Sequence, residues 1–542
     1  MSNFYTSHVS QAAAAVNNTP ATQAIPGREA EMAPNNNGGV SFVIDDWMYL
    51  DRFIMIGSSK GNNAKGAYEL TNQAIAKVVK LIGQDGLRVI NTAVAYSESG
   101  RAPSNDPAIV AVALAASVGS ALVQTAAYEA MLKVCRTGTH LFTFISVLNS
   151  LGKWNAAAKR GVAKWYTSRP IDRLAVQLLK YQQRNGWSHR DVLRKTHIKP
   201  QTQELNDLLF WVTSEKGTRE GIILPTLVND FQRVQTADDS ATVISIIEQN
   251  RNISWEMIPT QFLNKPEVIA SLLPNMGMTA MIRQLGKFSA LGLDKPFSDT
   301  FKLIRDKLSD EQQIKNGRIH PITLLTALKA YSLGSSKGSL TWSVNPQIKA
   351  VLNDAFYKSF TFLEDTGANI MLGIDCSGSM FGCHVGNNDL LTAAEVAGVM
   401  ALAIAKSHAN YFIGGFSRDF KPLAINPSMD LETCLRVIQK FDWSSTNVSS
   451  VMQYAERQKL PVDSFVIITD NDVNSGSQPT QALAKFRKAL KKPAASSIVI
   501  ATSMSEFSVA DPKDPLQFDI AGFDSSAPAL VSELARFSLR NS

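Results

Sequence analysis

Three side chains with oxygen donors follow a short apolar run in the stretch MLGIDCSGSM. Asp375, Ser377 and Ser379 are spaced two residues apart, a pattern that could build a nucleophile, a metal site or a polar turn. A hydrolase nucleophile elbow needs Gly-x-Ser-x-Gly, but Asp375 stands where the first glycine is required. A thiol phosphatase would pair Cys376 with a downstream arginine, and the following SGSMFGCH contains none. Both enzyme interpretations are therefore weakened.

A metal site fits this stretch better. A carboxylate and two hydroxyls after a buried strand are hard oxygen ligands that suit Mg²⁺, and open α/β sheets bind ligands at the carboxyl ends of their strands. Two other segments expected at that edge also supply oxygen: FDWSSTN contains Thr446, and IITDND contains Asp470 after an apolar run. The sequence thus predicts three loops around one divalent cation. For Ser377 and Ser379 the alternative is capping of a helix that follows the strand.

The elements that would position these residues lie after residue 360, where short apolar runs alternate with helical segments. This alternation is typical of βα units around a parallel sheet, so we predict a doubly wound α/β domain over 361–542. The apolar runs are 369–374, 410–416, 464–469 and 496–502, and the helical segments are 390–409, 430–441, 481–492 and 529–538.

The region 34–360 has a different pattern, with many short helical segments separated by Gly, Pro or Asn and almost no strand pattern. This favours an α-solenoid of stacked helices, although no fixed repeat period is present. Examples are 68–83, 140–152, 171–184 and 323–334. Residues 1–33 are rich in Ala, Asn, Thr and Pro, and we predict a mobile tail there.

The composition is that of a globular protein, with 45% hydrophobic and 19% charged residues. The four cysteines form no CxxC pair and the N-terminus has no signal-peptide pattern, so we expect a cytoplasmic protein in a reducing compartment. The uncharged stretch 107–128 is long enough to suggest a membrane span. Its abundance of Ala, Ser and Gly instead favours a helix buried between other helices, with no membrane contact.

Positive charge is concentrated in one window of the helical region. Residues 1–350 carry 38 Lys and Arg against 27 Asp and Glu, net +11, while 351–542 carry 16 against 20, net −4. Residues 151–200 alone hold 12 basic and 2 acidic residues. Aromatic residues are interleaved with these cations: Trp154, Trp165, Tyr166, Tyr181 and Trp187. Cations neutralise phosphates and aromatic rings stack on unpaired bases, so the window indicates RNA with single-stranded parts. The alternative is core aromatics beside a solvated charged face.

The ordered set of DxSGS, Thr446 and a TD pair after an apolar strand resembles the metal-ion-dependent adhesion site of von Willebrand factor A domains. In that family the cation keeps one position open for an acidic group of a partner, and the domain is not an enzyme. The resemblance implies that Asp375, Ser377 and Ser379 are first-loop ligands. Thr446 and Asp470 would then contribute directly or through water.

Several longer stretches resemble the Ro autoantigen family, in which a TROVE RNA-binding module precedes an A-type domain. They are 35–61, 185–200, 468–476 and 507–524, within a resemblance that extends over about 35–540. It implies a ring of HEAT-like helical repeats closed by the A-type domain. Small noncoding Y RNAs would bind the basic outer surface, and single-stranded ends of misfolded RNAs would enter the central hole. The protein would be a monomeric, non-enzymatic scaffold that could present RNA to a partner such as an exoribonuclease.

The resemblance also nominates RNA-binding residues. The family's Y RNA contact uses the His of GWSHxD, here His189, and local charge adds Lys180, Arg184, Arg190 and Arg194. RTGTHLFTFI resembles another family stretch and nominates Arg136 and His140 for the hole. Without the resemblance, His189 would be interpreted as a helix N-terminal residue capped by Ser188. The rival function is an adaptor that binds no RNA and uses its Mg²⁺-dependent domain to hold an acidic group of a partner protein.

Overall fold

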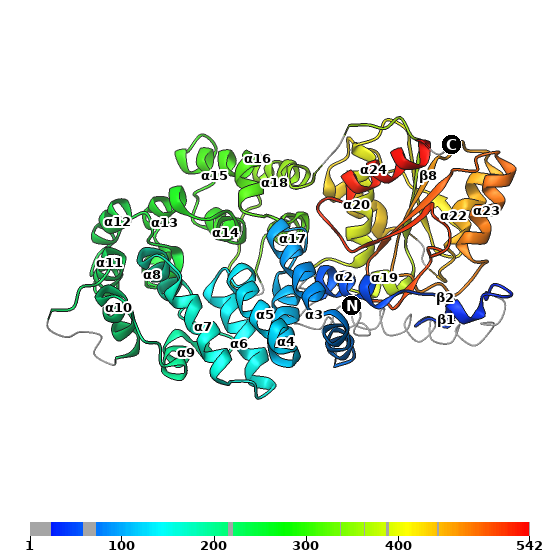
Figure 1. Ribbon diagram of the computed structural model, residues 1–542. Coiled ribbons are helices and arrows are strands. Elements are labelled where there is room, and N and C mark those ends of the chain that lie inside the picture. Colours follow the sequence, from blue (N-terminus) through cyan, green and yellow to red (C-terminus); the bar gives the residue numbers. More distant parts are fainter. Residues whose placement is uncertain are drawn as a thin grey trace.

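The computed structural model describes residues 23–57, 72–214, 221–336, 338–361, 364–385, 390–441 and 444–540. Helices make up the first part of the chain and a sheet domain the last part (Figure 1). Of the predicted tail 1–33, residues 1–22 lie outside the described residues, and so do residues 68–71 of the predicted helix 68–83.

The helices follow one another along a curve that leaves the sheet domain and returns to it (Figure 1). Helices α10 to α12 lie farthest from the sheet, and α17 lies beside it. In chain order the helices are α3 (Asn72–Ser99), α4 (Asp106–Val118), α5 (Ala121–Val134), α6 (Gly138–Ser150), α7 (Ala156–Thr167), α8 (Ile171–Lys180), α9 (His189–Thr196), α10 (Gln203–Thr213), α11 (Thr226–Gln235), α12 (Ser240–Gln249), α13 (Pro266–Leu272), α14 (Met278–Ala290), α15 (Asp299–Ser309), α16 (Glu311–Asn316), α17 (Pro321–Ser332) and α18 (Pro346–Lys358).

The uncharged stretch 107–128 folds as two helices rather than one. Helix α4 is buried along almost its whole length, because its small side chains let neighbouring helices approach closely. It ends at Gly119, where an ideal Cβ would lie 2.4 Å from the Val123 side chain. Ser120 then caps α5 by accepting a hydrogen bond from the backbone N–H of Val123. Among the described residues, no helix is long and apolar enough to cross a bilayer.

The sheet domain has six strands in the order β11-β9-β8-β5-β6-β7. All neighbours are parallel except β7, which pairs antiparallel with β6. The strands are β5 (Ile370–Asp375), β6 (Tyr411–Phe416), β7 (Phe420–Pro422), β8 (Ser464–Thr469), β9 (Ser496–Ala501) and β11 (Gln517–Ala521). Every residue of β5, β8 and β9 is buried, as expected for central strands with both faces covered.

Helices cover both faces of this sheet, as Figure 1 shows. Alternate strand residues face opposite sides: Leu372 and Ile374 pack with the cluster of α20 (Ala393–Lys406), α21 (Leu431–Gln439) and α24 (Ala527–Arg540), whereas Met371 packs with α22 (Ser449–Arg457) and α23 (Pro479–Ala489). The first cluster is continuous with the core of the helical region. The sheet domain therefore joins the helices through its α20 side.

Both ends of the helical region contact the sheet domain. At the late end, Lys329 of α17 forms an ion pair with Glu395 of α20 at 2.6 Å, and Lys349 of α18 pairs with Glu432 of α21 at 2.5 Å. At the early end, the guanidinium of Arg101, after α3, pairs with the buried carboxylate of Asp524. These contacts close the helical curve through the sheet domain.

The segment that precedes the helical region packs against the sheet domain. Strand β1 (Met32–Pro34) pairs with β2 (Val40–Val43), which pairs with β10 (Phe507–Ser508). The helix that follows, α2 (Asp46–Ile56), carries Arg52, which is buried and forms an ion pair with Asp519 of β11 at 2.7 Å. The described residues of the predicted tail, 23–33, thus lie against the sheet domain.

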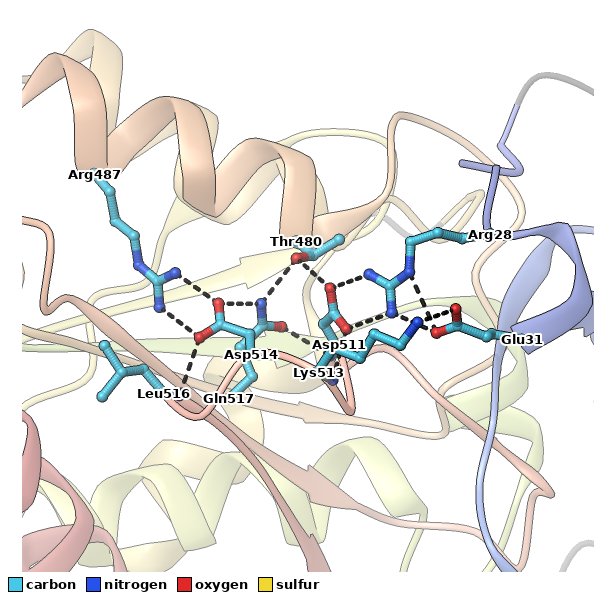
Figure 2. A network of polar contacts seen from close by, with 9 residues as sticks. All are labelled: Arg28, Glu31, Thr480, Arg487, Asp511, Lys513, Asp514, Leu516 and Gln517. Carbon is cyan, nitrogen blue, oxygen red and sulfur yellow. Dashed lines mark hydrogen bonds and ion pairs between the residues drawn. The ribbon is translucent and has the colours of Figure 1, made fainter. Parts of the chain in front are cut away.

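A polar network fixes this segment to α23 and β11 (Figure 2). Arg28 donates to both carboxylate oxygens of Asp511 and to Glu31, and Lys513 donates to Glu31 at 2.6 Å. Thr480 donates to Asp511 at 3.2 Å. The network continues through Gln517 and Asp514 to Arg487. Because its members come from both ends of the chain, it holds the N-terminal segment on the sheet domain.

Candidate functional sites

The first predicted ligand, Asp375, lies at the carboxyl end of β5 and is fully buried. Its carboxylate accepts hydrogen bonds from the backbone N–H of Ser377 at 2.9 Å and from the hydroxyl of Thr469 at 2.5 Å. The hydroxyl oxygens of Ser377 and Ser379 are 3.1 Å apart. Ser377 precedes the short helix α19 (Gly378–Gly382) without making a side-chain cap, so its hydroxyl is not committed to helix capping.

The other two predicted loops meet at the same edge. Asp470 follows β8, the strand beside β5, and is 7% exposed. Thr446 is buried, and its backbone N–H donates to the side chain of Asn474 at 2.7 Å while its carbonyl accepts from the Asn474 N–H at 3.1 Å. These bonds tie the Thr446 loop to the Asp470 loop. The structure therefore brings the three loops together, and the cation itself stays a prediction.

Two carboxylates at this edge oppose each other electrostatically. Burial and the neighbouring charge of Asp470 raise the pKa of Asp375 above its ordinary value. A divalent cation between the two would relieve this repulsion. Among the described residues, no cluster of three or more His, Cys, Asp or Glu side chains could hold a metal, so a cation at this edge would also need the hydroxyls as ligands. Two carboxylates and three hydroxyls are chemically suited to Mg²⁺.

The loop after Asp470 is held by an asparagine-rich turn of the N-terminal segment. Asn35 donates to the carbonyl of Val473 at 2.7 Å, Asn36 to the carboxylate of Asp472 at 3.2 Å, and Asn37 to the carbonyl of Asp472 at 3.1 Å. Gly39 follows, and an ideal Cβ there would lie 1.9 Å from the Val473 carbonyl oxygen. This contact was not predicted from the sequence, although the run NNNGG is typical of an unusual turn.

The basic window 151–200 forms α7, α8, the short hairpin of β3 (Gln183–Arg184) and β4 (Trp187–Ser188), and α9. Its exposed cations are Lys153, Arg160, Lys164, Arg173, Arg184, Arg194, Lys195 and Lys199. Its aromatic residues fall into a buried group and a half-buried group. Trp165 and Tyr166 are buried in the core. Trp154 and Trp187 are half-buried and stacked, with ring centroids 6.2 Å apart, and the Lys195 amine lies 5.4 Å from the Trp187 ring.

The four cations nominated on this face are weakly paired. Arg190 and Arg194, one turn apart on α9, both donate to the carbonyl of Thr213, at 3.2 Å each. Arg184 is exposed and donates to the carbonyl of the preceding residue at 2.6 Å. Lys180 lies 3.9 Å from the carboxylate of Glu256, a distance at which an exposed pair contributes little. We name the surface formed by Lys180, Arg184, Arg190 and Arg194 the basic face.

His189 lies beneath the basic face rather than on it. The side chain is 2% exposed, and its Nδ1 is 2.9 Å from the hydroxyl of Tyr166. Burial lowers the pKa of His189 to about 4, so the ring is neutral at pH 7. Ser188 caps α9 directly before it, with Asp191 completing a capping box. In this structure His189 therefore supports the surface through packing, and a direct contact with RNA stays a prediction.

Arg136 and His140 lie at the start of α6, close to the same histidine. Nε2 of His189 would be 2.8 Å from a Cβ on Gly138, which stands between them in sequence. Arg136 donates to the carbonyl of Ser97 at 3.1 Å and to its hydroxyl at 2.7 Å. Burial, with a smaller contribution from Arg136, lowers the pKa of His140 to about 4. The start of α6 therefore packs directly against His189.

Comparisons with known proteins cover both parts of the chain. The TROVE domain model matches residues 33–222 and 246–334, and the Ro60 vWA domain model matches 369–535. The chain is 30% identical over 525 residues to the RNA-binding protein RO60 of Deinococcus radiodurans, covering 96% of this chain and 97% of that protein. The RNA-binding protein RO60 of Caenorhabditis elegans is 28% identical over 579 residues, with 92% and 89% covered.

One solved structure is similar over nearly the same extent. The crystal structure of the Deinococcus radiodurans RO (RSR) protein matches with a TM-score of 0.68 and 30% identity, covering 91% of this chain and all of that one. This match confirms the predicted architecture, in which helical repeats form a ring closed by an α/β domain of the von Willebrand factor A type.

Proposed function

The chain belongs to the Ro family of RNA-binding proteins, and on that premise we propose that it is a non-enzymatic scaffold with two RNA sites. A small structured noncoding RNA, similar to a Y RNA, would lie on the basic face. The single-stranded end of a misfolded RNA would enter the ring near Arg136 and His140. Such a scaffold could present defective RNA to a nuclease for quality control.

The observation that carries this proposal is the set of weakly paired cations on α8, β3 and α9. Cations that share a carbonyl acceptor, as Arg190 and Arg194 do, keep most of their N–H groups available for phosphate oxygens. Each cation that neutralises a phosphate releases counterions, so binding should weaken steeply with salt. The stacked pair of Trp154 and Trp187 lies beside Lys195 and offers a platform for an unpaired base.

We propose that His189 acts by positioning rather than by charge. Its ring lies 4.7 Å from the Phe142 ring and contacts Gly138 at the start of α6, so it connects the floor of the basic face with the segment that carries Arg136. Substitution of His189 should therefore disturb both RNA sites. Substitution of Lys180 should affect only the structured RNA.

The test is a fluorescence anisotropy titration with a stem-loop RNA and, separately, with a single-stranded tail. His189→Ser combined with Lys180→Ala should weaken stem-loop binding by about tenfold or more. Circular dichroism must show that the variant is folded. Equal affinity of the wild type and the folded variant for the stem-loop would contradict the assignment of this face.

For the sheet edge we propose a bound Mg²⁺ or similar divalent cation. Asp375, Ser377 and Ser379 would hold it, with Thr446 and Asp470 direct or water-mediated ligands. The cation would supply one coordination position for a carboxylate of a partner protein, of which an exoribonuclease is one possibility. What supports this proposal is the convergence of two buried carboxylates and three hydroxyls at one edge.

The second candidate function is an adaptor that binds proteins alone, favoured by the rigid, buried construction of this edge. It predicts Mg²⁺-dependent capture of partner proteins and no RNA in the purified sample. The ratio of absorbance at 260 and 280 nm, before and after ribonuclease treatment, separates the two candidates. A protein that never carries or binds RNA would favour the adaptor.

A further inference from the structure

Two arginines from distant parts of the chain converge on the end of α3. Arg136 follows α5, and Arg318 precedes α17. Both donate through Nη1 to one acceptor, the carbonyl of Ser97 near the end of α3, at 3.1 Å and 3.2 Å. Residues 97 and 318 are separated by 221 positions, so this contact exists only when the ring is closed.

No ion pair neutralises the charges of these two arginines within the part of the chain that the structure describes. One carbonyl carries only a partial negative charge, and two guanidinium groups on it repel each other. Burial and this repulsion lower the pKa of Arg136, and the smaller opposing effect of the nearby Glu98 carboxylate does not offset them. Each arginine has five N–H donors in a planar fork, and the contacts with Ser97 use only one nitrogen of each.

The surrounding structure fixes both arginines in place. The Ser97 hydroxyl accepts from Arg136 and donates to Asn105 at 2.6 Å. Gly100 has a φ of +69°, and an ideal Cβ on it would lie 3.1 Å from the Arg318 side chain, so a glycine allows the arginine stem to pack there. Arg318 itself has a φ of +49°, a left-handed conformation that costs a non-glycine residue energy. The backbone is therefore strained at Arg318, the residue that supplies the second cation.

We propose that Arg136 and Arg318 form a binding site for a phosphate group of single-stranded RNA at the closure of the ring. The inference rests on the proposed function and deepens it, because it adds Arg318 and a defined ligand chemistry to the ring site. A phosphate placed between the two forks would accept several charge-assisted hydrogen bonds and relieve their mutual repulsion. It would also bridge the two ends of the helical region.

The test uses the full-length protein with Arg318→Asn, since Asn tolerates the left-handed conformation. The matched control is Arg305→Asn on α15, an exposed arginine whose ion pair, among the residues that the structure describes, is with its neighbour Asp306. Arg318→Asn should bind a single-stranded RNA tail about tenfold more weakly at 0.1 M salt and reduce the slope of log affinity against log salt by about 0.7. Arg305→Asn should leave both unchanged. A blunt stem-loop should bind both variants like the wild type.

Stability provides an independent readout. Arg318→Asn should have a melting temperature no lower than that of the wild type without ligand, because it removes a repulsion. Inorganic phosphate should raise the melting temperature of the wild type but not of Arg318→Asn. Arg318→Lys, which keeps the charge and loses the fork, should preserve the salt slope and weaken single-stranded RNA binding severalfold.

The outcomes separate this inference from the proposed function. If the wild type binds both RNAs and Arg318→Asn binds the single-stranded tail equally well, the phosphate site is wrong while the RNA-binding proposal stands. If phosphate stabilises the wild type but Arg318→Asn leaves single-stranded RNA affinity unchanged, the pair binds free anions only and the inference also fails. A wild type that binds neither RNA overturns both.

Discussion

The edge of the sheet domain that carries Asp375 and Asp470, the proposed metal edge, and the basic face of the helical ring are built in opposite ways. At the edge, the carboxylate of Asp375 is fully buried and fixed by two hydrogen bonds, one from Ser377 in its own loop and one from Thr469 at the end of β8. On the face, Arg184 and Arg194 are exposed and donate to backbone carbonyls. The edge suits a small ion, which needs ligands at fixed distances. The face suits a long polyanion, whose phosphates can be bound by mobile side chains at many positions.

This difference predicts different responses to substitution. A preorganised site should lose its function when one ligand is removed, because the remaining oxygens cannot move to replace it. A polyelectrolyte surface should lose affinity in steps, one phosphate contact at a time. The four predictions that follow test this contrast, beginning with the largest expected effect.

Substitution of a single ligand should abolish cation binding. Asp375→Asn removes one of the two carboxylates at the edge, so Mg²⁺ or Mn²⁺ affinity should fall by roughly a hundredfold or more, measured by isothermal titration calorimetry. RNA affinity should not change. Glu533→Gln on the exposed side of α24 makes the same change in charge and is the control. Cation binding retained in Asp375→Asn would show that this carboxylate is not a ligand.

Removal of the whole basic face should weaken structured RNA binding strongly but not completely. Changing Lys180, Arg184, Arg190 and Arg194 to Ala should lower stem-loop affinity by about a hundredfold and reduce the salt slope by roughly three to four. Single substitutions should each cost only severalfold. A control that changes Lys302, Arg305, Lys315 and Arg251 to Ala removes the same charge from exposed positions elsewhere. If both quadruple variants lose affinity equally, only net charge matters.

The asparagine turn should increase the affinity of the metal edge for divalent cations, although it supplies no ligand itself. Asn36→Ala with Asn37→Ala removes the hydrogen bonds to Asp472 that fix the loop next to Asp470. Divalent cation affinity should fall about tenfold, as is usual when groups that orient ligands are lost. The exposed Asn252→Ala is the control. Unchanged affinity in the double variant would mean that the loop holds its shape without this turn.

The buried histidines should make the ring sensitive to mild acid. The pKa of His189 and of His320 is lowered to about 4 by burial, whereas an unfolded histidine has a pKa of about 6.5. Between these values the unfolded chain binds more protons, so the free energy of unfolding decreases as pH falls from 7 to 5. Each histidine should contribute about 1–2 kcal/mol.

Urea unfolding at pH 7, 6 and 5 measures this loss. His189→Phe should reduce the pH dependence, because Phe does not titrate and its ring can pack beside Phe142. His197→Asn is the control, since His197 is exposed with a φ of +51° that Asn tolerates. A pH dependence unchanged in His189→Phe would place the titrating groups elsewhere.

Much of the fold could be predicted from local sequence patterns. The predicted strand 464–469 coincides with β8, and the predicted helix 140–152 lies within two residues of α6 at Gly138–Ser150. These elements have strong periodicity and clear boundaries, and their burial follows from the pattern itself. Family and architecture were also predicted, since the motifs that carry the resemblance are long.

Contacts between distant segments could not be predicted in the same way. Strand β2 is only four residues long, and its partner β10 is near the other end of the chain, so no local pattern indicates the pairing. The family resemblance nominated His189 for contact with RNA, yet Tyr166 and Phe142 lie against its ring. The proximity of Arg318 to Arg136 could not be predicted either. The two residues are far apart in the sequence and come together only when the ring closes.

The N-terminal segment can dock on the sheet domain only after the C-terminal strands have been synthesised. Arg52 and its acceptor Ser505 are 453 residues apart, so α2 leaves the ribosome long before the strands it will contact exist. Contacts this far apart form late and slowly. Until then the edge of β2 has no partner from β10 and is open to incorrect pairing. The first described segment of the chain is therefore among the last to reach its final position.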